Sequence, residues 1–152
     1  MFPQRSTLAY FAFAIIAFAA AVAAQSRPAV NVSRGQLALR GYDAVAYWTD
    51  SRPLQGTAEF EHRWNGAVWR FATAANRDTF AKDPARYAPE FGGYCAYAVS
   101  RGYTADGDPN AWRIVDGHLY LNYSKRVQAL WEEDVPGNIA KGRNNWPGVL
   151  EK

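Results

Sequence analysis

The sequence predicts a small single α+β domain, built of two β-hairpins with short helices packed on them. Two turn signals, Asn65-Gly66 and Asp116-Gly117, each lie between runs of alternating apolar and polar residues, which is the pattern of a hairpin. Segments of helical periodicity follow both hairpins. With 152 residues, 49% of them hydrophobic and 15% aromatic, the chain suffices for one globular domain with a real core and is too short for two.

Residues 1–24 carry the pattern of a secretory signal peptide. A positive charge at Arg5 precedes the apolar run Leu8–Ala20, and Ala21-Val22-Ala23 supplies the small residues that a signal peptidase requires. We therefore expect a periplasmic or secreted protein. The alternative is an uncleaved membrane anchor, because the 17 residues Leu8–Ala24 reach the lower length limit of a spanning helix. No later apolar run is as long, so no membrane contact is expected once the signal is cleaved.

Charge and motifs exclude several function classes. Without Arg5 the chain has 16 basic and 14 acidic residues, a net charge of +2, and no Lys/Arg block, so nucleic acid is not an expected partner. The sequence has no Cys-x-x-Cys pair for thioredoxin-like exchange, no His-Glu-x-x-His for zinc hydrolysis and no Cys-x-x-Cys-His for covalent haem.

The chain after the signal divides into a linker, residues 25–38, and a domain, residues 39–150. A short strand is expected over 36–42, and Asp43 is a good N-cap for a short helix over 44–48. Further helices are expected from Thr73 to about Lys82, after Ser124, and from Pro136 to about Asn145.

The turn signals also predict the registers of the hairpins. The first hairpin covers 58–72, and the second pairs 111–115 with 118–123. The first turn places Trp64 opposite Ala67, His62 opposite Trp69, and Phe60 opposite Phe71. The second turn places Trp112, Ile114, Leu119 and Leu121 on one face, and Arg113, Val115, His118 and Tyr120 on the other.

The only cysteine, Cys95, is the candidate reactive atom. It follows Gly92-Gly93 and precedes small residues, which predicts a turn leading into a short helix. A helix N-terminus would lower the pKa of the thiol and favour the thiolate. A lone cysteine cannot form an internal disulfide, so an exported chain must leave Cys95 buried, metal-bound, paired with another molecule, or catalytic.

Three interpretations of Cys95 remain open from the residues alone. In the first, the thiolate is a ligand for a soft, copper-like or zinc-like ion, joined by His62 or His118 and by Asp43 or a tyrosine. Alternatively it is a redox or nucleophilic group with a histidine as base, in a thiol-dependent oxidoreductase or peroxidase with a redox partner protein. The third interpretation is an inert, buried cysteine in a structural or interaction domain.

Segments spread along the chain carry a family resemblance. They are Gly41–Tyr47, Trp64–Phe71, Asn76-Arg77, Phe80, Asp83-Pro84, Tyr87–Pro89, Gly92–Ser100 and Trp146-Pro147. Together they resemble the exported YHS domain-containing proteins of bacteria, a subfamily that includes selenoproteins. The resemblance covers about Leu39 to Pro147 and implies a YHS-like fold for residues 39–150.

The resemblance also implies a setting for the thiol. The wider YHS family is presumed to bind metal and occurs beside copper-exporting ATPases. The cysteines of its metal-associated members correspond here to Ala46, Ala72 and Asn76, so a site made of several thiols is not expected. In the exported subfamily the selenocysteine falls at the position of Cys95, which implies a reactive thiol. The expected function is binding of a copper-like soft metal, or thiol redox chemistry, through Cys95.

Overall fold

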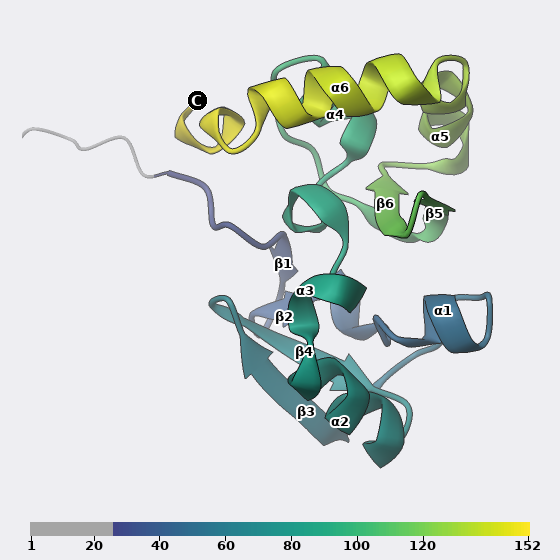
Figure 1. Cartoon of the computed structure of the whole chain (residues 1–152). Coiled ribbons are helices and arrows are strands. Elements are labelled where there is room, and N and C mark those ends of the chain that lie inside the picture. The colour runs from purple at the N-terminus through teal and green to yellow at the C-terminus, as the bar shows by residue number, and fades with distance from the viewer. Residues whose placement is uncertain (1–25) are drawn as a thin grey trace, which may run out of the picture.

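The structure is a computed structural model that describes residues 26–152, and the predicted signal peptide lies outside the described residues. It is a small α+β domain with a four-stranded mixed sheet and a separate hairpin, so the expected fold class is confirmed. Figure 1 shows the four-stranded sheet with the first three helices in the lower half and the hairpin with the last three helices in the upper half.

The elements follow one another along the chain in a simple order. The strands are β1 (Val32–Ser33), β2 (Leu37–Ala38), β3 (Thr57–Trp64), β4 (Ala67–Phe71), β5 (Asp108–Val115) and β6 (His118–Asn122). The α-helices are α1 (Ala46–Thr49), α2 (Ala74–Lys82), α3 (Pro84–Tyr87), α4 (Ala96–Ser100), α5 (Lys125–Glu132) and α6 (Val135–Asn145). Three 3₁₀ segments join them: η1 (Leu39–Gly41), η2 (Glu90–Gly93) and η3 (Gly148–Glu151).

The first hairpin has the predicted turn, and its register is correct on the turn side. Trp64 pairs with Ala67 and His62 pairs with Trp69, as expected. Further from the turn the prediction is wrong, because Thr57, and not Phe60, lies opposite Phe71. The reason is an irregularity in β3 between Thr57 and Glu61, which shifts the pairing. Such bulges leave no signature in an alternating pattern.

The segment expected as a linker, residues 25–38, forms two strands in its described part. β1 pairs antiparallel with β2, and Leu37 of β2 pairs in parallel with Val68 of β4, so the sheet order is β1-β2-β4-β3. Each of these strands has only two residues, which is too short to produce an alternating pattern. Two short parts of the segment, Val32–Ser33 and Leu37–Ala38, therefore add strands to the sheet.

Local capping bonds position three helices, two of them at the predicted capping residues Thr73 and Ser124. Thr73 Oγ1 accepts from the backbone N–H of Asn76 at 3.1 Å, where α2 begins. Ser124 Oγ accepts from the N–H of Val127 at 3.2 Å, where α5 begins. The last helix starts one residue before Pro136 and is capped by Asp134.

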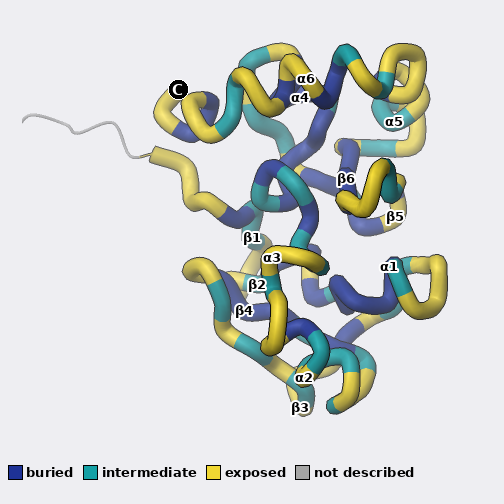
Figure 2. Tube along the Cα trace, in the orientation of Figure 1, coloured by how far each residue is buried: buried dark blue, intermediate teal, exposed yellow. Residues whose placement is uncertain are grey.

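The second hairpin lies between two clusters of buried side chains and contributes to both. Leu119 and Leu121 belong to the cluster that covers the first hairpin, whereas Tyr120 belongs to the cluster under α4, α5 and α6. This alternation confirms the predicted faces of β6. Figure 2 shows β6 as buried where it passes between the two halves. The hairpin thus joins the two halves by packing one face of β6 into each cluster.

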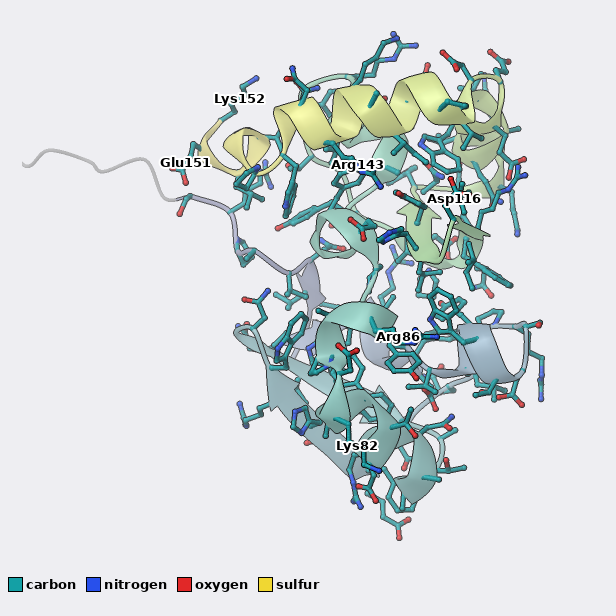
Figure 3. The ribbon with its side chains drawn as sticks, in the orientation of Figure 1. Lys82, Arg86, Asp116, Arg143, Glu151 and Lys152 are labelled. Carbon is teal, nitrogen blue, oxygen red and sulfur yellow. The ribbon has the colours of Figure 1, made fainter. Side chains whose placement is uncertain are left out.

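Charged side chains are spread over both halves of the surface. In Figure 3 the labelled basic residues Lys82, Arg86 and Arg143 come from α2, α3 and α6. A search of the described residues for a helix with the length and apolarity needed to cross a membrane finds none.

Candidate functional site

Cys95 is the residue immediately before α4, where the backbone changes from an extended segment to a short helix. Its N–H donates to the carbonyl of Ala105 at 2.9 Å, and it forms a parallel bridge with Leu121 of β6. Gly92 and Gly93 have φ values of 62° and 82°, which favour glycine. A side chain on Gly92 would also collide with the carbonyl oxygen of Ala29. The two glycines therefore allow the backbone turn that places Cys95 in the interior.

The thiol of Cys95 lies beside a buried amide. Its exposed fraction is 1%, and its Sγ lies 3.7 Å from Oδ1 of Asn122, which is itself fully buried. The same Oδ1 accepts from the N–H of Tyr97 at 3.1 Å. An amide oxygen can only accept, so the sulfur contacts it as an S–H donor. This arrangement favours the protonated thiol.

Burial changes the pKa of the thiol in the opposite direction from the lowering that a helix N-terminus was expected to cause. It raises the pKa of Cys95, and the backbone N–H groups of Ala98, Tyr123 and Tyr97 offset this only in part. The helix that follows Cys95 has five residues, so its dipole is short. The candidate thiolate of the sequence is therefore a thiol at neutral pH in this setting.

A pocket of about 230 Å³ opens beside the sulfur. Tyr103 and Tyr123 stand at its rim with exposed fractions of 53% and 57%, unusual for residues of this size. Among the described residues, none with a charged side chain lines it. Its lining consists of Cys95, Tyr97, Ala98, Tyr103, Ala105, Tyr123 and Val127. Cys95 is thus one of the lining residues of an apolar, tyrosine-rich pocket.

The two histidines lie in separate places. His62 is half-buried on β3, where its ring contacts that of Phe80 edge-on at 6.0 Å between centroids. His118 is exposed at the start of β6, and its Nδ1 lies 2.6 Å from Oε1 of Glu90. Neither histidine lines the pocket beside Cys95.

The carboxylate of Asp43, the third candidate ligand, accepts hydrogen bonds from four N–H donors. Oδ1 accepts from the backbone of Val45 and Ala46 at 2.8 and 3.2 Å. Oδ2 accepts from the backbone of Ala72 at 2.9 Å and from the side chain of Asn76 at 2.8 Å. The carboxylate is fully buried and ties the start of α1 to the end of β4 and to α2. The sequence predicted Asp43 as the N-cap of a helix over 44–48, but α1 begins at Ala46 and its N-cap residue is Val45; the bonds of Asp43 to Ala72 and Asn76 were not predicted.

The four candidate ligands do not form a cluster. Within residues 26–152, no group of three or more His, Cys, Asp or Glu side chains is placed to hold a metal ion. Sequence reasoning also missed Asn122, Tyr103 and Tyr123, which surround the thiol. A signal was present for Asn122, because an asparagine at the end of an apolar strand needs buried partners.

Comparison of the chain with family models, with curated proteins and with solved structures finds no match.

Proposed function

We propose that the protein is an exported binding domain of YHS type, whose pocket beside Cys95 takes a small, uncharged aromatic ligand. The observation that carries the proposal is the pocket itself, in which a shielded thiol and three tyrosines converge without a charged side chain among the described lining residues. Aromatic and apolar walls favour a ligand of the same character. A thiol packs well against a ring and, being uncharged, does not repel it.

Binding of p-cresol, a neutral one-ring probe, tests this proposal. Amide NMR spectra of the purified protein should show shifts confined to the residues around the pocket, within 95–105 and 122–127. Tyr103→Ala should weaken binding about fivefold, as expected for one aromatic contact of about 1 kcal/mol. Leu130→Ala is the matched control, because Leu130 is also exposed, at 38%, but lies outside the pocket lining. Unchanged spectra at millimolar p-cresol would contradict the proposal.

Thiol redox chemistry is the second candidate, since Cys95 is among the residues that line the pocket. Its weakness is the raised pKa of Cys95, because the thiolate is the form that attacks. Alkylation of the native protein by iodoacetamide across pH 6–10 separates the two candidates. A reaction midpoint below the ordinary thiol value of about 8.5 would favour redox chemistry.

Copper binding through Cys95, joined by His62, His118 or Asp43, is tested by titrating copper(I) into the reduced protein. The binding-domain proposal expects Cys95→Ser to bind copper(I) as the unmodified protein does, because Asp43 is filled by N–H donors and both histidines lie outside the pocket. A large loss of copper(I) affinity in Cys95→Ser would favour metal handling instead.

A further inference from the structure

A second pocket lies where the two halves of the molecule meet, and it shares no lining residue with the Cys95 pocket. Its volume is about 260 Å³. Its aromatic lining residues are Trp64 and Trp69, beside the turn of the first hairpin, and Phe91 and Trp146. In Figure 1 the N-terminal segment passes along this side of the molecule, from the C-terminal end down to β1.

We call this second pocket, at the junction of the two halves, the seam pocket. Its aromatic side chains are held in place by the fold. The rings of Trp64 and Trp69 lie 5.7 Å apart, and those of Phe91 and Trp146 lie 5.9 Å apart. The Trp69 indole also donates to the carbonyl of Trp64 at 3.0 Å. Trp69 and Phe91 are buried, at 1% and 4% exposure, and they hold the half-buried rings of Trp64 and Trp146 in place. A ligand would therefore meet mainly the preformed ring surfaces of Trp64 and Trp146.

Glu90 supplies the charge of the pocket. Among the described lining residues it is the only one with an ionisable side chain. Its Oε1 is paired with His118 Nδ1 at 2.6 Å, and no hydrogen bond to Oε2 is found within residues 26–152. The nearby cation of Arg86, labelled in Figure 3, lies 5.6 Å over the ring of Tyr87 and does not line the pocket. Glu90 therefore brings to the pocket a carboxylate that is paired through one of its two oxygens.

We propose that the seam pocket binds a compact quaternary ammonium cation. Tryptophan rings attract cations through the negative faces of their π-systems, most strongly when water is excluded. A neutral apolar ligand would remove water from Glu90 without replacing it, and an anion would be repelled. A primary ammonium is a compact, strongly hydrated charge that loses its water in an aromatic pocket, whereas the methyl groups of a quaternary ammonium pack directly on the rings. The carboxylate and the indoles thus favour one ligand class.

This inference goes beyond the proposed function, because no residue of the Cys95 pocket takes part in it. The probe is choline, and the comparison ligand is 3,3-dimethylbutan-1-ol, which has the same shape without the charge. Calorimetry on the purified protein should give choline at least about tenfold tighter binding, corresponding to about 1.4 kcal/mol. Equal binding of the two ligands, or no choline binding at millimolar concentration by the folded protein, would overturn the proposal.

Two pairs of variants locate the binding site. Glu90→Gln should bring choline to the affinity of its neutral analogue, whereas Glu61→Gln, which also removes an ion-paired carboxylate, should leave choline binding unchanged. Trp64→Leu should weaken choline binding about tenfold by removing a π-face. Trp48→Leu is its control, since Trp48 is half-buried outside the pocket lining. Choline affinity unaffected by both Glu90→Gln and Trp64→Leu would also overturn the assignment.

Discussion

Cys95 and Asn122 meet in the interior through a contact of 3.7 Å between Sγ and Oδ1, although 27 positions separate them in the chain. Asn122 is fully buried and also accepts from the backbone N–H of Tyr97, so its oxygen serves both sides of the turn into α4. Its Nδ2 has no partner within the described part of the chain. The asparagine therefore stabilises the thiol form of Cys95 and the start of α4 together.

Asn122→Ala should lower the free energy of unfolding by about 1–3 kcal/mol, because it leaves the N–H of Tyr97 buried without an acceptor. Urea unfolding measures the change. Asn144→Ala is the control, since Asn144 is exposed on α6, and it should change stability by no more than about 0.5 kcal/mol. Equal effects of the two substitutions would show that the Asn122 contacts carry no net stability.

The stability of the protein should fall at alkaline pH because of Cys95. Burial raises the pKa of this thiol, so the unfolded chain loses its proton first, near the ordinary value of about 8.5. Above that pH the native state binds more protons than the unfolded state, and its stability is lost progressively up to the raised pKa. Urea midpoints at pH 7.5 and pH 9.5 should therefore differ more for the unmodified protein than for Cys95→Ala. The slope due to the thiol cannot exceed about 1.4 kcal/mol per pH unit.

Asp43→Asn should destabilise the protein by about 2–4 kcal/mol. The amide retains one acceptor oxygen, but its NH₂ group then faces N–H donors that had a carboxylate oxygen as partner. Asp50→Asn is a matched change at an exposed position and should cost less than about 0.5 kcal/mol. Thermal or urea unfolding of both variants measures the difference. If Asp43→Asn changed the free energy of unfolding no more than Asp50→Asn does, the hydrogen bonds that join α1, β4 and α2 through Asp43 would not contribute to stability.

Gly92→Ala should cost more stability than Gly66→Ala. Both glycines have positive φ values, 62° and 74°, so both substitutions carry the left-handed backbone cost of about 1–2 kcal/mol. An added Cβ at Gly66 meets nothing within 4 Å, whereas at Gly92 it collides with the carbonyl of Ala29. We expect about 1–3 kcal/mol of further loss for Gly92→Ala from that overlap. Similar unfolding free energies for the two variants would indicate that the N-terminal segment moves aside easily.

Much of the local structure could be predicted from particular residues. Asn65-Gly66 and Asp116-Gly117 specify two-residue turns, and the turns fix which residues pair beside them. Thr73 and Ser124 cap helices by bonds that span three positions. The bulge in β3 and the two-residue strands of the expected linker escaped prediction, because neither leaves an alternating pattern.

Of the candidate site, only Cys95 itself was predictable from the sequence, and the residues around it were not. The sequence by itself determined that one thiol is present, that it begins a short helix, and that no second thiol can join it. Only the tertiary structure decided that Cys95 faces Asn122 and tyrosines, while His62, His118 and Asp43 contact other partners. The physical reason is that turns and caps depend on neighbours within a few residues. Burial and the identity of a contacting atom depend on residues far apart in the chain, and these set the protonation of the thiol.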